Sequence, residues 1–401
     1  MKIGFIADLH LGYYPTILSS VLDRHSERQY LDKVFSRLAD ERVELIAVMG
    51  DLLHTWRGRS GWMALMHFLG LIRRYRIPTF MVRGNHDVIV PQLYDELTDI
   101  SDGYFFTFVG LKALEEMRPI WAKEEPHEGI AYKKVMEMAE IRPVAILPHA
   151  SSILPEGVLH AMRENTIDML GGEGALLFAH YFLESRLKGI LASVISREFV
   201  IDDIAMMKAD TVIFAGHDHR RYISPDGRYV IGSMLPRDAR LGGEDVSFGV
   251  ADITKDGVKY TSLSIPLPYR LEYKKQFDTV DDAIDWIKGV LEEKSMLIVS
   301  SLDIRDKDVT LVDIEKRLAD DGIDTSRVRI RRLIPIIRQE KDGHIVELEG
   351  VANISIKDAF NQYFETHKAD LPPLPDGVDE QMFKGVMNDI FDALLRGDAD
   401  D

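Results

Sequence analysis

The sequence predicts a layered α/β (α+β) fold, in which two sheets pack as a sandwich flanked by helices, and two observations lead to this class. Short apolar runs alternate with longer amphipathic segments through the first part of the chain. The first three of these runs also end on Asp, Asn or His, and the carboxyl edge of a sheet is where α/β folds place their ligands. At 401 residues, 46% of them hydrophobic and 29% charged, the chain is long enough for two or three domains.

The first region alternates between strand and helix. Apolar runs predict strands at residues 2–7, 43–49 and 77–82, and amphipathic patterns predict helices at 28–40 and 61–75. This order of elements is typical of a layered domain whose helices cover a sheet.

The middle of the chain, residues 111–165, follows no such rhythm. We expect it to form an insertion that lines or covers the site, with a helix at 129–140 and a strand at 144–147. The regular pattern then returns and predicts strands at 175–180 and 211–217, with a helix near 202–208. Between residues 221 and 265, short strands separated by Gly-containing turns predict antiparallel ribbons that close a second sheet.

The character of the sequence changes after Pro266 and Pro268, and we place the first domain at residues 1–268. Residues 269–345 predict a small α+β domain, with strands at 271–277, 296–302 and 327–333 and helices at 280–291 and 311–319. Its last strand alternates arginine with apolar residues from Arg327 onward, so one face carries guanidinium groups. This face is either a phosphate contact or a solubility device, and the pattern leaves both open.

Residues 346–401 form a third segment, in which a stiff Pro-rich link at 371–375 joins two predicted helices. One apolar stripe runs from Ile356 to Phe364, and a wider one runs from Met382 to Leu395. Two short helices have too little mass to bury both stripes against each other. The helices either pack back on the main body or dock on a partner, and their Met and Phe content favours a partner.

Composition narrows the possible functions. Cysteine is absent, which excludes a disulfide framework or a zinc–thiolate site, and no apolar run approaches the roughly 18 residues of a membrane span. We therefore expect a cytoplasmic protein without a signal peptide or membrane segment. A net charge of −17 opposes nucleic-acid binding in general, but much of the acid lies in the later half of the chain, on predicted helix faces and a tail.

Four short motifs carry the chemistry: DLH at 8–10, GD at 50–51, GNHD at 84–87 and GHDH at 216–219. Asp8 and His10 lie two apart at a strand end, so both side chains can enter one crevice and hold one metal ion. Asp51 has two carboxylate oxygens, which suits it to bridge two ions. Asn85 offers a hard amide oxygen, delivered by the tight turn that Gly84 permits.

Histidines complete the predicted ligand set. His217 and His219 alternate along the chain, so each can serve a different ion. A seventh ligand has two candidates, His149 and His180, each of which follows an apolar run. We favour His180 because it ends an unbroken strand pattern, whereas Pro148 interrupts the backbone before His149. Turns between strands have no need of so many histidines, which argues against a purely structural role for the motifs.

Together the four motifs resemble the calcineurin-like metallophosphoesterase superfamily. More narrowly, DLHLG at 8–12 and GDLLH at 50–54 resemble its Mre11/SbcD nucleases. The α+β domain after Pro268 is similar to the capping, DNA-binding domain of those nucleases, and the C-terminal helices resemble the segment that binds the Rad50/SbcC ATPase. The sequence departs from the pattern at Asp218, between the last two histidines, and at residues 111–165.

The resemblance implies a role for each site residue. One ion would be held by Asp8, His10 and His219, the other by Asn85, His180 and His217, with Asp51 bridging the two. The family implies two Mn²⁺ ions per chain, which polarise a phosphate and activate water for in-line attack. His86 would protonate the leaving oxygen, with Asp87 orienting it, and the alternative for His86 is a structural role beside the ligands. For His54, a phosphate contact and a structural role both stay open.

We therefore expect a manganese-dependent DNA exonuclease and endonuclease that acts in double-strand-break end processing. The resemblance implies a homodimer, associated with the nucleoid and partnered by a Rad50/SbcC-type ATPase. The alternative is a metallophosphoesterase acting on small phosphodiesters or phosphoproteins, for which an acidic surface is no handicap. A third hypothesis, a noncatalytic scaffold, is disfavoured by the intact ligand set.

Overall fold

A computed structural model gives the fold. It describes residues 1–15, 18, 21–55, 59–87, 91–149, 156–170, 174–183, 200–201, 210–224, 227–236, 243–305, 309–331, 333–341 and 344–349. The chain divides into two compact units. The first consists of Met1–Lys274, Ile287–Ser300 and Asp324–Arg331, and the second of Lys275–Trp286, Ser301–Ile323 and the described residues beyond 332.

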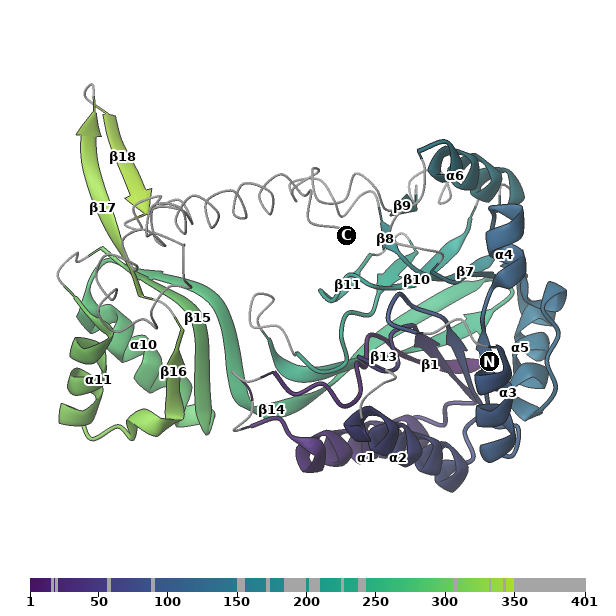
Figure 1. The fold of residues 1–401 in the computed structure, drawn as a ribbon, viewed down its shortest axis with the longest axis horizontal. Helices are drawn as coiled ribbons and strands as arrows, with labels where there is room; N and C mark the ends of the chain where they lie inside the picture. The colour runs from purple at the N-terminus through teal and green to yellow at the C-terminus, as the bar shows by residue number, and fades with distance from the viewer. Residues whose placement is uncertain are drawn as a thin grey trace, which may run out of the picture. The chain divides into compact units, whose positions relative to one another are not determined.

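The first unit is built on a mixed sheet with the strand order β14-β13-β1-β2-β3-β4 (Figure 1). Four of its strands are parallel: β1 (Lys2–Ile6), β2 (Leu45–Met49), β3 (Thr79–Val82) and β4 (Phe105–Phe108). β13 (Gly243–Thr254) runs antiparallel to β1, and β14 (Gly257–Phe277) runs antiparallel to β13. Because β1, β2 and β3 are parallel, their carboxyl ends meet at one edge, and the loops after them carry Asp8, Asp51 and Asn85.

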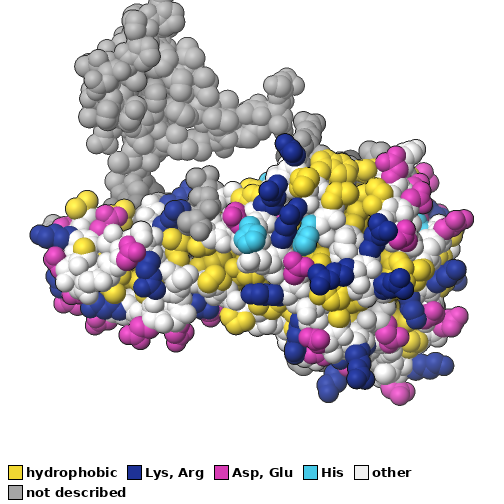
Figure 2. Space-filling view, turned by 90° about the horizontal axis from the view of Figure 1, so that it is seen from below, with side chains coloured by type: hydrophobic (Ala, Val, Ile, Leu, Met, Phe, Trp, Pro, Cys, Tyr) yellow, Lys and Arg dark blue, Asp and Glu magenta, His cyan; other side chains and the backbone are white. Residues whose placement is uncertain are grey.

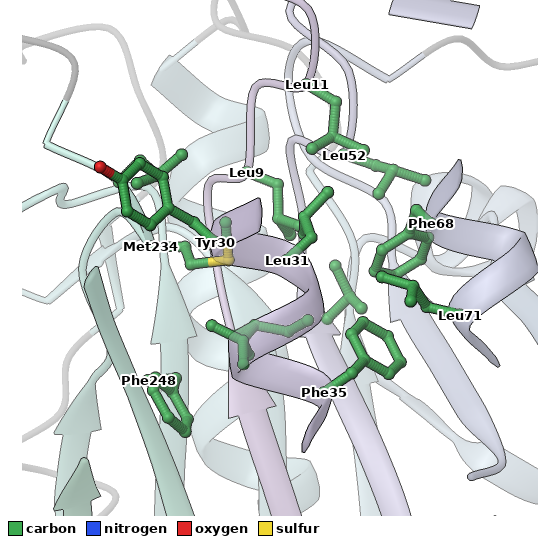
Figure 3. Close-up of a cluster of buried hydrophobic side chains, with 14 of the residues drawn as sticks. Leu9, Leu11, Tyr30, Leu31, Phe35, Leu52, Phe68, Leu71, Met234 and Phe248 are labelled. Carbon is green, nitrogen blue, oxygen red and sulfur yellow. The ribbon is translucent and has the colours of Figure 1, made fainter. Parts of the chain in front are cut away.

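Three helices cover one face of this sheet: α1 (Arg24–Asp40), α2 (Arg59–Tyr75) and α3 (Pro91–Ile100). Figure 3 shows Leu31 and Phe35 of α1 near Phe68 of α2 in the buried cluster. Ile6 and Val48 belong to this cluster, while their strand neighbours belong to the core on the other face of the sheet. Strands β1 to β4 are largely apolar because both faces are covered, and their polar positions are Lys2, Thr79 and Thr107.

A second mixed sheet packs against the opposite face of the first, with the order β11-β12-β10-β7-β6-β5. Its strands are β5 (Ile120–Trp121), β6 (Val144–Leu147), β7 (Leu176–His180), β10 (Val212–Gly216), β11 (Tyr222–Ile223) and β12 (Arg228–Val230). Phe5 of β1 stacks on Phe214 of β10 between the sheets, with ring centroids 4.2 Å apart. On the outer face, Met162 and Leu170 of α6 (Glu156–Leu170) share a buried cluster with β7 and β10. The predicted α/β sandwich of two sheets flanked by helices is confirmed.

The described part of residues 111–165 is built into the framework of the fold, where we expected an insertion that lines or covers the site. Where described, they form α4 (Leu111–Glu116), β5, the short helix η2 (Ala122–Glu124), α5 (Ile130–Ile141), β6 and part of α6. β6 pairs with both β5 and β7 in the second sheet, and Val135 and Met138 of α5 are buried in the core between the sheets. The apolar residues of this stretch are therefore used for framework packing.

β14 is one continuous strand through Pro266 and Pro268, where the sequence predicted a break. Its pairing with β13 shifts register here: Gly243 lies opposite Leu271 and Asp245 lies opposite Pro266. The proposed division of the chain at residue 268 stays a prediction.

The region after β14 holds α10 (Val280–Glu293), β15 (Met296–Ile304), α11 (Leu311–Asp320), β16 (Val328–Ile330), β17 (Leu333–Lys341) and β18 (His344–Glu349). The single strand predicted at 327–333 is divided between β16 and β17, which pair with different parts of β15. The Arg327 guanidinium makes contacts within the fold. It donates to the carbonyl oxygens of Leu291 at 2.8 Å and Lys294 at 2.9 Å, so it caps the end of α10.

Within the described ranges, no helix has the length and apolar character that crossing a membrane requires. The helix predicted near 202–208 and the two C-terminal stripes with their Pro-rich link lie outside the described residues.

Candidate metal centre

The loops after β1, β2 and β10 have an unusual backbone at four of the predicted ligands. The φ angle is +47° at Asp8, +43° at His10, +51° at Asp51 and +82° at His217. Left-handed backbone at a non-glycine residue costs of order 1–3 kcal/mol, and such strain concentrates at functional sites. The strand ends turn abruptly here, and polar side chains from separate strands converge.

Four side chains form a first donor cluster, whose ligand atoms all lie within 4.8 Å of one another: Asp8, His10, Asp51 and His219. His10 Nε2 lies 3.2 Å from His219 Nε2 and 3.6 Å from Asp51 Oδ2. His219 Nε2 lies 3.7 Å from Asp8 Oδ1. Both carboxylates are buried, with Asp8 0% and Asp51 1% exposed. Imidazole nitrogens and carboxylate oxygens at this spacing form a donor set for a divalent ion.

A second cluster shares Asp51 with the first. Asn85 Oδ1 lies 3.0 Å from both His180 Nε2 and His217 Nδ1. His180 Nε2 also lies 3.5 Å from Asp51 Oδ2. The same carboxylate oxygen is thus close to one histidine of each cluster, which is the position that a bridging ligand needs. The structure brings all seven predicted ligands together, and their coordination of metal stays a prediction.

The His180 ring is oriented by the backbone. Its Nδ1 lies 2.7 Å from the carbonyl oxygen of Met49, which can only accept a hydrogen bond. In the neutral ring Nδ1 therefore carries the proton, and the lone pair of Nε2 is directed at Asp51 and Asn85. Metal-ligating histidines are held in this way by a hydrogen bond to the other ring nitrogen. The oxygen and imidazole donors fit two hard divalent ions such as Mn²⁺.

Burial and mutual charge shift the pKa values of the metal-free centre. Burial raises the pKa of Asp8. Burial also acts to raise the pKa of Asp51, but His180, His10 and the His86 amide outweigh it, and the pKa is lowered. Burial acts to lower the pKa of His180, but the carboxylates of Asp51 and Asp8 raise it to about 9. Asp51 and His180 therefore form an ion pair that a bound metal ion would replace.

We expect the metal-free protein to lose stability as the pH rises from about 6.5 to about 9. The folded-state pKa of His180 is about 9 against an ordinary value of 6.5, so in this window the folded state keeps a proton that the unfolded state releases. The stabilisation is complete below pH 6.5 and is lost as the pH rises through 9, by about 3 kcal/mol. Urea unfolding in chelator across this range measures it. An unchanged slope in His180→Gln would contradict the assignment.

His86 and His54 lie beside the first cluster. The His86 amide donates to Asp51 Oδ1 at 2.8 Å, and its ring lies edge-on to His10 with centroids 4.8 Å apart. Its Nδ1 lies 3.0 Å from the carbonyl oxygen of His54, which places the proton on Nδ1. His86 Nε2 is then a donor only in the imidazolium form, and a general acid at this position requires that form. The ligand atoms of His10, His54 and His86 also lie within 4.8 Å of one another.

Asp87 hydrogen bonds to backbone groups and not to His86, contrary to our expectation. Its carboxylate accepts from the N–H groups of Gly84 at 2.8 Å, Asp51 at 2.9 Å and Leu52 at 3.2 Å. Burial and the charge of Asp51 raise the pKa of Asp87 to about 6. Asp87 therefore ties the loop after β2 to the turn after β3 and positions Asp51.

His149, the candidate that we disfavoured, is buried at the end of β6 beside the second cluster. Its ring stacks on Tyr181, with centroids 4.9 Å apart and planes at 23°, and its centroid lies 5.5 Å from that of His217. Burial and the charges of His180 and His217 lower its pKa to about 3. His149 is thus a neutral, buried neighbour of His180 and His217.

An ion pair explains the acidic residue Asp218, at which the sequence departs from the family pattern. Asp218 is 3% exposed and accepts from Arg220 Nε at 2.8 Å and Arg220 Nη2 at 3.1 Å. This bidentate pair closes the turn between His217 and His219, which serve different clusters.

Sequence reasoning missed Tyr13, whose ring stacks on His54 at a centroid distance of 3.9 Å. An aromatic residue directly after the DLHLG motif was the available signal.

Comparisons with known proteins agree with this geometry. A family model described as calcineurin-like phosphoesterase matches residues 1–221, a range that contains all seven predicted ligands. A structural likeness extends to a dimetal phosphatase from Danio rerio, with 14% identity over 67% of this chain and 99% of that chain and a TM-score of 0.37. The protein TT1561 of Thermus thermophilus has 10% identity over 65% of this chain and 97% of its own, with a TM-score of 0.36. Both structural likenesses are weak, and the family match carries the assignment.

Proposed function

Because this chain belongs to the calcineurin-like phosphoesterase family, we propose that it is a manganese-dependent nuclease that hydrolyses the phosphodiester bonds of DNA. Metal-dependent phosphoester hydrolysis follows from the family and from the donor clusters. The observation that carries the chemistry is the position of Asp51 Oδ2, 3.6 Å from His10 Nε2 and 3.5 Å from His180 Nε2. One carboxylate that serves two clusters allows two ions to act on one phosphate.

When bound, the two ions would polarise the phosphate and activate water for in-line attack. One would be held by Asp8, His10 and His219, the other by Asn85, His180 and His217, with Asp51 between them. The protein supplies orientation and protons. The Met49 carbonyl orients His180, Asp87 positions the Asp51 loop, and we assign His86 Nε2 as the donor to the leaving oxygen.

We expect His86→Ala to slow hydrolysis of esters with poor leaving groups by about 10²- to 10⁴-fold. The 3′-oxygen of a nucleotide needs a proton as it leaves, whereas p-nitrophenolate is stable without one. The variant should therefore keep most of its activity on bis-p-nitrophenyl phosphate. Values of kcat on the two kinds of ester measure the difference. Equal losses would show that His86 acts on the phosphate or the metal centre and not on the leaving group.

Three features support DNA as the substrate. The DLHLG and GDLLH motifs resemble those of Mre11/SbcD nucleases. Arg221, which is exposed, lies two residues after the ligand His219. Figure 2 shows Lys and Arg side chains around histidines on the face in view, although the net charge of the chain is −17. A local group of cations attracts phosphates at short range, where the distant acidic residues are screened by salt.

End-labelled single-stranded and duplex DNA, incubated with Mn²⁺, Mg²⁺ or a chelator, tests the proposal. We expect cleavage with Mn²⁺ and none with the chelator. Hydrolysis of small diesters without cleavage of either DNA would overturn the DNA assignment and favour the small-phosphodiester or phosphoprotein alternative.

We further propose that the chain works as a homodimer with a Rad50/SbcC-type ATPase at DNA double-strand breaks. The resemblance and the Met- and Phe-rich stripes within residues 346–401 support this, and the closely spaced arginines within residues 329–332 support DNA contact. Deleting the chain from residue 371 onward should abolish binding to such an ATPase and leave basal nuclease activity intact. Unchanged binding would reject the docking role.

A further inference from the structure

An exposed aromatic ring lies beside the candidate metal centre. Tyr13 is 37% exposed, and its ring stacks on the imidazole of His54, with centroids 3.9 Å apart and planes at 18°. His54 stacks in turn on His86, with centroids 5.0 Å apart and planes at 27°. The three rings form a short stack that connects the proposed proton donor to a tyrosine at the surface.

The loop that carries Tyr13 is held firmly. Glu27 of α1 is fully buried, and its carboxylate accepts from the Gly12 N–H at 3.2 Å and from the Tyr14 hydroxyl at 3.1 Å. The Tyr13 N–H donates to the carbonyl oxygen of the ligand His10 at 3.1 Å. A buried carboxylate is costly unless it is hydrogen-bonded, so these contacts lock the loop. Tyr13 is therefore presented at a fixed position next to the ligands.

Close packing also holds the backbone of this loop in place. Gly12 has a φ of +79°, and a Cβ there would lie 2.5 Å from the backbone nitrogen of Gly61 at the start of α2. The Ser60 hydroxyl also donates to the Gly12 carbonyl oxygen at 3.2 Å. An exposed tyrosine on such a rigid support binds a flat partner with little loss of conformational entropy.

We propose that Tyr13 is the stacking platform for an unpaired nucleobase next to the scissile phosphate. This inference rests on the proposed function and names the part of the substrate that the site recognises beyond the phosphate. Every nucleobase has a π face that stacks on an aromatic side chain without a sequence requirement. In a duplex these faces are covered by neighbouring base pairs, so the platform selects single-stranded or frayed DNA. A phosphorylated serine or an alkyl diester offers no flat ring next to the phosphate.

A dinucleotide and its baseless analogue test the proposal with Mn²⁺ present. Thymidylyl-thymidine and the dimer in which both bases are replaced by hydrogen share one phosphodiester, so their kcat/KM ratio isolates the bases. We expect the wild type to prefer the thymidine dimer by about tenfold, mostly through KM. Tyr13→Leu should remove this preference, so that its kcat/KM ratio for the two dimers falls to about one, and Tyr13→Phe should keep the preference because the ring remains.

Two controls make the outcome decisive. Ile100→Ala removes an apolar side chain that is 45% exposed on α3, and it should leave the preference unchanged. Thermal unfolding of each variant checks that the loop still folds. If Tyr13→Leu lowers kcat/KM equally for both dimers, or for neither, the stacking role is overturned. The proposed function would still stand in that case, provided that the wild type cleaves DNA. A wild type that cleaves no DNA would overturn both.

Discussion

Replacing Asp51 by Asn is expected to lower phosphoesterase turnover by at least about a thousandfold. Asp51 Oδ2 lies within 3.6 Å of a histidine of each donor cluster, and the carboxylate is 1% exposed. The amide keeps the size of the side chain but removes its negative charge and one of its two ligating oxygens. Metal titration by calorimetry should therefore show weaker binding, with fewer than two ions held per chain.

A matched substitution on the surface provides the control. Asp102 has a side chain that is 65% exposed and pairs with Arg73 at 3.0 Å. Asp102→Asn makes the same chemical change at an exposed ion pair, which contributes little to stability. It should leave turnover and metal affinity unchanged. Wild-type turnover in a correctly folded Asp51→Asn variant would reject the assignment of Asp51 as the bridge.

Replacing Gly50 by Ala is expected to cost about 3 kcal/mol of stability and to disrupt the second donor cluster. Gly50 has a φ of +80°, and a Cβ there would lie 2.1 Å from His180 Nδ1. The methyl group would push the imidazole away from the Met49 carbonyl, which it approaches at 2.7 Å. Urea unfolding measures the stability. Metal titration and kcat measure the centre, and both should fall with the displacement of His180.

The same glycine-to-alanine change at Gly70 is expected to have the opposite effect on stability. It lies in α2 with no atom within 4 Å of an added Cβ, so alanine there meets open space. Gly70→Ala should raise stability by roughly 0.5–1 kcal/mol, because glycine is the more costly residue in a helix interior, and should leave kcat unchanged. A Gly50→Ala variant as stable and active as Gly70→Ala would contradict the packing around His180.

Most elements near the site were predictable because their signals are local. The strands observed as β2 and β6 and the helices α1 and α2 follow from apolar periodicity within a few residues. The ligand motifs were predictable for a similar reason, since Asp8, Asp51 and Asn85 each follow an apolar strand directly. Parallel strands then bring their carboxyl ends to one edge, which the alternation of strand and helix already implied.

Sequence patterns were not sufficient where the same pattern fits two different structural roles. Residues 111–165 lack a regular rhythm and were expected to line or cover the site. In the structure β5, β6 and α5 are part of the second sheet and the core, and His149 after β6 lies beside the ligands. An apolar residue looks the same in a lid and in a core, and only its tertiary neighbours distinguish them. For the arginines from Arg327 onward the pattern left a phosphate contact and a solubility device open, and in the structure the Arg327 guanidinium caps α10 through the carbonyls of Leu291 and Lys294.

By itself the sequence determined the class of fold, the residues that meet at the candidate metal centre and the phosphoester chemistry of the family. These depend on residue type and on spacing along the chain. Tertiary structure decided that Asp87 positions Asp51, that His149 is a neighbour of the ligands, and that Tyr13 stacks on His54. The physical reason is that hydrogen bonds and ring stacking act over about 3–6 Å in space. The partners lie as far apart in sequence as His149 and His217, and only the packed sheets bring them within that range.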